Sequence, residues 1–480
     1  MKELVHHIKS SLLRGGVDMS TQKQMERSLT FLPIVLFGFS FMALATVFST
    51  YGIAAELSHG MVPGSYVVAL VVMLFTAYSY GQMSKIIPSA GSAYAYTQKS
   101  INPYVGFMVG WAILMDYLFI PMVNYLLFGI FFSAAFPAIP PYVWILSMML
   151  LVTYINMKGV KLASKANALI TIFSLLFILL FIGFSIKEVI GGAGAGTLFT
   201  FEPFYNSEEP FSFIVAGAAL LCFSFLGFDS ATTFAEETVK PAKTIPRAVF
   251  SITLAGGAVF IAVSYFAHLV WPNYGTFSNP DSASHEIITF VGGEALASGF
   301  LAVYAITAFG SAMSSQASAS RILYAMGRDG QLPRKFFGTL HSKLQTPVNN
   351  ILFISAFSLL ALFVSLSLVA SFINFGAFLA FTSVNIAVIS YYFIRQRQRS
   401  LKGTLLYLIV PFIGALLDLY LLINLDMNSK ILGTAWFVLG LVYMFFLTKG
   451  FKQRPPELHL SADHSHHNEE EEKHESRYSS

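Results

Sequence analysis

The stretch Phe223-Ser224-Phe225-Leu226-Gly227-Phe228-Asp229-Ser230 lies inside a long apolar segment and places a glycine two residues before an aspartate. Glycine adopts backbone conformations that end a helix, so Gly227 allows the chain to unwind here. An ionisable side chain within a membrane helix is costly and commonly functional. A helix broken at mid-membrane frees N–H and C=O groups for a ligand. The stretch predicts a broken membrane helix with Asp229 in a site, although Gly227 alone is also compatible with tight helix packing.

The composition around this stretch is that of a membrane protein. Of 480 residues, 55% are hydrophobic and 11% are charged, with a mean hydropathy of +0.65, whereas soluble domains carry roughly 25% charged residues. The net charge of +4 is too small to indicate nucleic acid binding. The single cysteine, Cys222, excludes an internal disulfide and a cysteine-based metal site. With no catalytic cluster and no nucleotide-binding Gly-x-x-x-x-Gly-Lys-Ser/Thr motif, we expect no enzyme, no ATP-driven pump and no cofactor.

Apolar stretches close to the ~20 residues that cross a hydrocarbon layer recur along the chain. They predict an all-α polytopic membrane protein with twelve transmembrane helices in contact with lipid. Their approximate limits are 31–54, 64–84, 105–132, 142–157, 164–186, 211–235, 248–270, 295–319, 347–366, 369–394, 404–425 and 430–448.

The basic residues indicate how these spans are oriented. If the N-terminus is cytoplasmic, 27 of the 29 Lys and Arg residues fall in cytoplasmic segments, and only Lys187 and Lys430 face outward. Lys and Arg are enriched in cytoplasmic loops, and a miscounted span would destroy this partition. The sequence therefore predicts twelve spans with both termini in the cytoplasm.

The chain divides into segments at its polar stretches. The join 191–196 is rich in glycine and separates two halves of five spans each. From 451 onward the chain is polar, so we expect a disordered tail. Its histidines, His464, His466, His467 and His474, could bind a metal, but a solvated tail is the simpler interpretation. The predicted segments are 1–30, 31–190, 208–394, 395–450 and 451–480.

A second break is predicted in the first span, where Ala43-Leu44-Ala45-Thr46 precedes further hydroxyl residues and Gly52. Small and hydroxylated residues also serve ordinary helix packing. The first span is the first of its five-span half, and the sixth span is the first of the second half. This correspondence favours a break in both spans.

Two more acids lie within predicted spans. Asp116 is in the third span, where Tyr117 and Asn124 are seven residues apart and share a helix face. A carboxylate at this depth costs at least ~2.5 kcal/mol, so we expect Asp116 to line a cavity. Asp418 in the eleventh span has two open interpretations, a polar contact between peripheral helices or a role in transport.

Three segments carry a resemblance to a known family. They are Pro88-Ser89-Ala90-Gly91-Ser92-Ala93-Tyr94-Ala95-Tyr96 after span two, Ala235-Glu236-Glu237-Thr238 with Pro241 and Ile245-Pro246-Arg247 after span six, and Arg321-Ile322-Leu323-Tyr324 to Gly330-Gln331-Leu332-Pro333 after span eight. In these segments the chain resembles the amino acid, polyamine and organocation transporter superfamily. The resemblance implies two inverted five-helix repeats plus two peripheral helices, alternating access, and a central site between broken spans one and six.

Within the superfamily, the runs 98–103, 116–124 and 222–229 look most like bacterial putrescine importers. Many members that carry amino acids have a Gly-Ser-Gly-like turn in span one for the substrate carboxylate. That turn is absent near Ala43 to Thr46, which favours a diamine. Several members have a lysine midway along span five in place of a sodium ion, whereas Ser174 stands at about that depth here, so coupling to protons or to sodium stays open.

We therefore expect a secondary active transporter that imports a polyamine, with putrescine favoured, or an amino acid across a bacterial plasma membrane. An amino-acid permease or a substrate exchanger of the same superfamily is the alternative, and a channel is a third class. Asp116 and Asp229 would hold ammonium groups, and Tyr117, Phe225 and Phe228 would enclose the methylenes. In a rival assignment, one of the two acids carries the coupling proton.

The other residues expected to bind substrate come from the two breaks: Gly227 in span six, and Ala43, Ala45 and Thr46 in span one. Ser314 and Ser315 in span eight are, together with the two acids, the candidates for binding the coupling ion.

Overall fold

The twelve predicted spans all fall on helical structure. The protein's structure, a computed structural model, describes residues 27–136, 138–278, 280, 283–364, 366–423 and 427–456. Within these residues, nine helices are long and apolar enough to cross a membrane, and a bent pair in the first span makes a tenth. Two shorter apolar helices, Pro141–Met157 and Val348–Leu362, correspond to predicted spans four and nine.

In chain order the spans are α2 (Phe31–Met42) with α3 (Thr46–Leu57), α4 (Val62–Ile86), α6 (Pro103–Ala135), α7 (Pro141–Met157), α8 (Val160–Ile190), α9 (Phe211–Leu221) with the 3-10 segments η1 (Cys222–Phe225) and η2 (Phe228–Glu237), α10 (Pro241–Val270), α11 (Ala283–Arg328), α13 (Val348–Ser358) with η5 (Leu359–Leu362), α14 (Leu366–Val388) with the π-helical η6 (Ile389–Arg395), α15 (Leu401–Thr404) with the π-helical η7 (Leu405–Ile409) and α16 (Val410–Ile423), and α17 (Met427–Leu447).

The connections contain more helix than the sequence predicts. The segment after span two contains a helix between predicted spans, α5 (Ser92–Ser100). The eighth span, predicted as 295–319, lies within the 46 residues of α11, which has a non-helical backbone at Gly293. Its last two turns lie beyond the predicted apolar stretch, and Arg321 and Arg328 there pair with Glu237 and Glu236.

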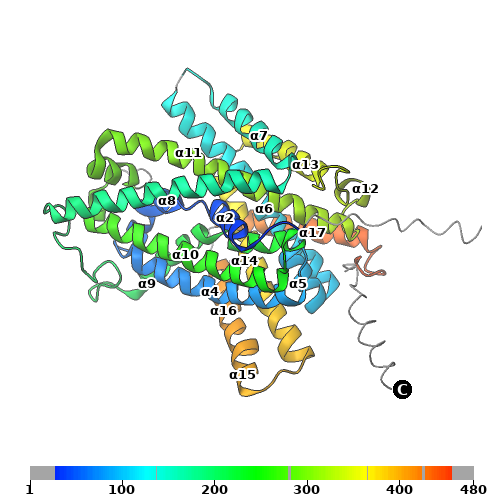
Figure 1. The fold of residues 1–480 in the computed structure, drawn as a ribbon. Helices are drawn as coiled ribbons and strands as arrows, with labels where there is room; N and C mark the ends of the chain where they lie inside the picture. Colours follow the sequence, from blue (N-terminus) through cyan, green and yellow to red (C-terminus); the bar gives the residue numbers. More distant parts are fainter. Residues whose placement is uncertain are drawn as a thin grey trace, which may run out of the picture.

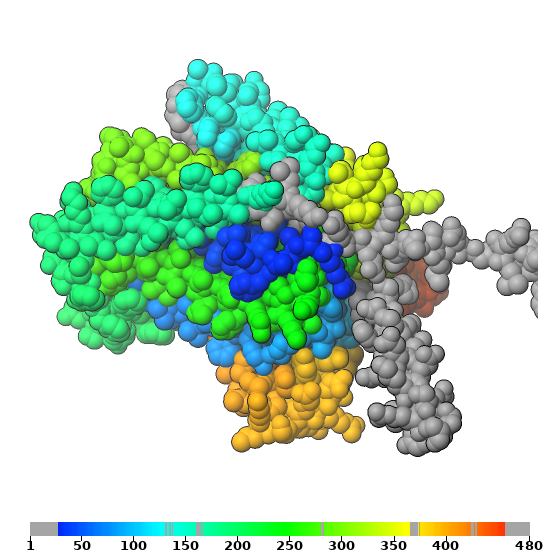
Figure 2. All heavy atoms as spheres, in the orientation of Figure 1, coloured from blue at the N-terminus to red at the C-terminus, as the bar shows by residue number. Residues whose placement is uncertain are grey.

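The outer surface of the helices is apolar, as expected of a protein solvated by lipid. In α8, Leu176, Leu179 and Leu180 are 51–64% exposed, whereas Phe177 and Phe181 on the opposite face are buried. Figure 2 shows α8 across the visible face, beside the blue residues of α2 and the green residues of α10. Polar side chains buried in the protein interior are therefore candidates for functional residues.

The two broken spans lie beside each other, with α2 packed against η2 and α3 packed against α9. The rings of Phe37 in α2 and Phe234 in η2 have centroids 4.6 Å apart. Leu29, just before α2, forms a β-bridge with Thr238, just after η2. In Figure 1, α4 and α10 run side by side, while α7 and α13 lie at one margin and α15 at the opposite one.

Both predicted terminal segments fall largely outside the described residues. Of segment 1–30 the structure describes 27–30, and of the tail it describes 451–456. The four histidines proposed as possible metal ligands lie outside the described part of the chain.

Candidate functional site

The break predicted in span six is confirmed. The α-helix ends at Leu221, and Gly227 adopts a φ of 106°, which separates η1 from η2. A side chain is disfavoured there because of this backbone conformation. It is also excluded by space, since a Cβ on Gly227 would lie 2.1 Å from Cδ1 of Phe41.

The break predicted in span one is also present. Helix α2 ends at Met42 and α3 begins at Thr46, with a bend of 46° between them. Ala43 has a φ of 51°. The hydroxyl of Ser311 in α11 donates to the carbonyl oxygen of Phe41 at 2.9 Å, and Thr46 donates to the carbonyl oxygen of Ala43 at 2.6 Å. Polar side chains thus satisfy carbonyl groups freed by the break.

The two predicted acids are both buried. The Tyr117 hydroxyl donates a hydrogen bond of 2.8 Å to Oδ2 of Asp229, while Oδ1 of Asp229 has no hydrogen-bond partner. Oδ1 of Asp116 likewise has none. Neither acid forms an ion pair within the described part of the chain. Two buried carboxylates with no neighbouring positive charge are costly, and the binding of a cation or a proton would remove that cost.

Aromatic rings surround Asp229 on the side of α4 and α14. Phe228 packs against Tyr80 and Phe381, with ring centroids 5.7 and 5.2 Å away. The Tyr80 hydroxyl lies near the Asp229 carboxylate. The Tyr96 ring packs edge-on against the Tyr80 ring, and neither tyrosine hydroxyl has a hydrogen-bond partner. These groups form a polar patch inside an aromatic enclosure.

Phe225 has different surroundings from Phe228. Its ring packs against Tyr66 and Phe260, with centroids 6.5 and 5.4 Å away. The adjacent Ser224 hydroxyl lies 3.2 Å from the Tyr66 hydroxyl. Phe225 thus fastens η1 to α4 and α10.

A cavity of about 90 Å³ lies beside the break in span one. Its walls include Ala43 and Thr46 from the break, Asn124 from α6 and Ser311 from α11. Asn124 also donates to the Ser311 hydroxyl at 3.0 Å. This cavity therefore contacts part of the predicted polar stripe of α6.

The acids do not line this cavity. Phe41 does line it, and the Phe41 ring also packs edge-on against Tyr117, with centroids 5.7 Å apart. Tyr117 in turn holds Asp229. The structure thus divides the predicted substrate-binding residues into two groups with Phe41 between them, and neither Ala45 nor Phe225 lines the cavity.

The coupling-ion candidates in α11 have partners of their own. Asn167 of α8 donates to the Ser314 hydroxyl at 2.7 Å and accepts from Ser40 of α2 at 3.1 Å. Ser315 donates to the carbonyl of Ser311 in its own helix. Ser314 is therefore connected to the end of α2, while the described contacts of Ser315 stay within α11.

Ser174, midway along α8, is linked to the wall of the cavity. Its hydroxyl lies 2.8 Å from the Thr307 hydroxyl, and Thr307 lines the cavity.

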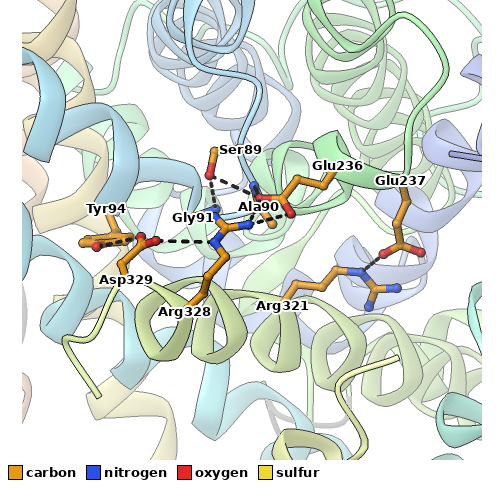
Figure 3. A network of polar contacts seen from close by, with 9 residues as sticks. All are labelled: Ser89, Ala90, Gly91, Tyr94, Glu236, Glu237, Arg321, Arg328 and Asp329. Atoms are coloured by element: carbon orange, nitrogen blue, oxygen red, sulfur yellow. Dashed lines mark hydrogen bonds and ion pairs between the residues drawn. The ribbon is translucent and has the colours of Figure 1, made fainter. Parts of the chain in front are cut away.

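A network of ion pairs joins η2 to the end of α11 (Figure 3). Glu237 pairs with Arg321, and both side chains are almost fully buried. Arg328 donates through one nitrogen to both oxygens of Glu236 at 2.9 Å. The Ala90 N–H donates to Glu236 at 3.1 Å, which brings the segment before α5 into the network.

Asp329 and Tyr94 extend this network toward α5. The Tyr94 hydroxyl donates to Asp329 at 3.1 Å, and Asp329 also contacts Arg328. Burial raises the pKa of Asp329 from 3.8 to about 6, and the positive charge of Arg328 opposes that rise. Burial, and then the nearby charge of Asp329, raise the pKa of Tyr94.

Several of these residues were missed in the sequence. Phe41, Tyr80, Tyr96 and Ser311 are common residue types in apolar helices, and no local pattern distinguishes them. Glu236, Glu237, Arg321 and Arg328 all lie in the segments that carry the family resemblance, but their pairing could not be read from it. Among the described residues, no group of three or more His, Cys, Asp or Glu side chains is arranged to hold a metal ion.

Known proteins provide an independent comparison. Residues 38–444 match the amino acid permease family. The chain is 41% identical to the low-affinity putrescine importer PlaP of Escherichia coli over 91% of this chain and 97% of that protein. It is 28% identical to the methylthioribose transporter and 26% identical to the branched-chain amino acid permease BcaP of Bacillus subtilis, each over 90% of this chain and 95% of the relative. The chain therefore belongs to the amino acid permease family, a twelve-helix family of membrane transporters within the amino acid, polyamine and organocation superfamily.

Proposed function

We propose that the protein imports a diamine, with putrescine favoured, across the plasma membrane by ion-coupled alternating access. The observation that carries this proposal is the pair of buried acids, Asp116 and Asp229, each with a carboxylate oxygen that lacks a hydrogen-bond partner. A substrate with two ammonium groups would supply the donors and the positive charge that these oxygens lack. The similarity to a putrescine importer supports the same substrate class.

The surroundings of the acids suit the remainder of a diamine. Phe228, Tyr80 and Tyr117 present rings around Asp229. A cation over such a ring gains about 0.5–2 kcal/mol, and the methylenes gain by leaving water. The unpaired Tyr80 and Tyr96 hydroxyls would accept from ammonium N–H groups. In this assignment Phe41 must move for substrate to pass from the cavity to the acids.

The ion-pair network supports alternating access. It ties η2, the second half of the broken span, to the end of α11. Ser311 at the cavity and Arg321 in the network are ten residues apart on α11, which is about 15 Å along a helix. In the proposed cycle, the network closes the cytoplasmic side while substrate enters through the cavity. Breaking these ion pairs would free η2 and open the path inward.

The proposed orientation has both termini in the cytoplasm, and cysteine labelling tests it. The native Cys222 is buried, which keeps the background low. A cysteine in place of the exposed Lys187 should react with a membrane-impermeant reagent in whole cells, and one in place of Lys335 should react only after permeabilisation. The reverse pattern would contradict the orientation.

Uptake of labelled putrescine into proteoliposomes tests the function. Proton and sodium gradients are imposed separately, and a panel of amino acids serves as competitors. We expect saturable, gradient-driven putrescine uptake, and the effective gradient identifies the coupling ion. Uptake of amino acids alone would overturn the diamine assignment, and uptake that requires substrate preloaded inside would identify an exchanger.

A further inference from the structure

A third buried acid lies outside the proposed substrate site. Asp418 in α16 is fully buried. Its Oδ2 atom accepts hydrogen bonds from Thr76 of α4 at 2.8 Å and from the amide of Asn385 in α14 at 2.9 Å. The Ser79 hydroxyl orients that amide by donating to its oxygen at 2.6 Å. Three helices thus converge on one carboxyl group.

The other oxygen of this carboxyl group, Oδ1, has no hydrogen-bond partner. No ion pair within the described residues includes Asp418. Two neutral donors on one oxygen cannot compensate a buried negative charge. The pattern matches a neutral carboxylic acid, in which Oδ2 accepts as a carbonyl oxygen and Oδ1 carries the proton.

The neighbouring elements provide little charge to this site. Helix α14 contains no ionisable side chain, and α4 contributes Tyr78 and Tyr80 near Thr76, with Lys85 nine residues beyond Thr76. The remaining ionisable side chains of neighbouring elements are Tyr407 in η7 and Cys222 in η1. A proton is therefore the simplest source of neutrality for Asp418.

The position of this acid connects it to the moving parts of the transporter. Thr76 and Tyr80 are four residues apart and share a face of α4, and Tyr80 lies near Asp229. Helix α4 packs against η1, η2 and α10. A movement of the broken span that carries α4 with it would pull Thr76 away from Asp418 and change the surroundings of its carboxyl group.

We propose that Asp418 is a proton-binding carboxyl group of the transport cycle, an inference that rests on the proposed function. It is neutral in the conformation described here. When α4 moves and water reaches Oδ1, the O–H bond breaks, its electron pair stays on the carboxylate and a water molecule accepts the proton. If this water lies on the cytoplasmic side and reprotonation comes from water on the outer side, each turnover moves one proton inward with the substrate.

The Asp418→Asn variant is a sharp test because asparagine mimics a neutral aspartic acid. Its amide oxygen can accept from Thr76 and Asn385, so the variant should keep the melting temperature of the unaltered protein. Infrared spectra of the purified proteins should show the carbonyl band of a protonated carboxyl group that the variant lacks. In proteoliposomes, the variant should transport with one proton fewer per substrate and with a shifted pH dependence.

Two results would overturn the inference. One is an unaltered pH dependence and proton-to-substrate ratio in the variant, because Asp418 would then be permanently neutral. The other is the lack of any infrared band that depends on Asp418. If the unaltered protein takes up no putrescine under any gradient, the proposed function fails separately. The Asp418 band would then be followed across pH, and a band that never disappears while the protein stays folded overturns the inference as well.

The Thr76→Val variant is the matched control for the hydrogen bonds. It removes a donor to Oδ2 but leaves the titratable group in place. We expect it to retain the proton-to-substrate ratio of the unaltered protein while its pH dependence shifts. Loss of a proton from that ratio in Thr76→Val would assign the effect to helix packing and contradict a specific role of Asp418.

Discussion

The Tyr117 hydroxyl donates a hydrogen bond of 2.8 Å to Asp229, and this bond joins the continuous helix α6 to the short segment η2 that follows a broken helix. The carboxylate is thereby held between a continuous α-helix and a 3-10 segment that follows the break. Hydrogen bonds to charged groups contribute about 1.5–3 kcal/mol. The bond therefore ties η2 to α6 through the Asp229 carboxylate.

Replacing Asp229 by Asn should abolish concentrative uptake, because the substitution removes a negative charge from the proposed ammonium site. Tyr117→Phe should weaken apparent affinity by about tenfold, the effect of losing about 1.4 kcal/mol. Uptake over a range of substrate concentrations and pH measures both effects. Unchanged uptake and pH profile in Asp229→Asn would exclude this residue from binding and from coupling.

Asp116→Asn should distinguish diamines from monoamines. If each acid holds one ammonium group, the variant loses affinity for putrescine but keeps its affinity for butylamine, which has a single ammonium group. Competition of both amines against a labelled substrate measures the difference. Equal losses for the two amines would show that Asp116 does not contact a second ammonium group.

Gly227→Ala should destabilise the protein and impair transport. Its φ of 106° costs a residue with a side chain about 1–2 kcal/mol, and the new Cβ would also collide with Phe41. Gly183→Ala is the matched control, because no atom lies within 4 Å of the added methyl group in α8. Thermal unfolding in detergent compares the two. Equal melting temperatures would mean that the break at Gly227 readily rearranges.

Arg321→Met should destabilise the protein by about 3–5 kcal/mol because it leaves the buried Glu237 without its cation. The double variant with Glu237→Leu should recover most of that stability while transport remains altered, since the link between η2 and α11 is absent. Lys187→Ala breaks an exposed ion pair with Glu188 and should change stability by less than about 1 kcal/mol. Full recovery of transport in the double variant would contradict a gating role for the pair.

The stability contributed by Asp329 should depend on pH. Its pKa is raised from 3.8 to about 6 by burial, so its contribution is fully present below about pH 4 and is lost as the pH rises through 6. Asparagine mimics the neutral form at every pH. Asp329→Asn should therefore become more stable relative to the unaltered protein between about pH 4 and 7. Melting temperatures of both proteins across this range test the sign, and a constant difference would contradict it.

The errors of the sequence-based prediction have local causes. Residues 321–328 follow the apolar stretch 295–319, yet they form the last two turns of α11, where Arg321 and Arg328 pair with Glu237 and Glu236. The segment 92–100 lies between two predicted spans, and it forms α5, whose residues are nearly all buried. Hydropathy detects burial in lipid and does not detect helices that are buried by protein.

The sequence by itself determined the spans, the two breaks and the acids within the helices. These are local properties, because a membrane helix needs about 20 apolar residues and a break needs a residue that tolerates an unusual backbone. The tertiary structure alone decided which side chains meet. Tyr117 and Asp229 are 112 residues apart, and Thr76 and Asp418 are 342 residues apart. Such contacts depend on how helices distant in the chain pack together, and a single sequence contains no record of that packing.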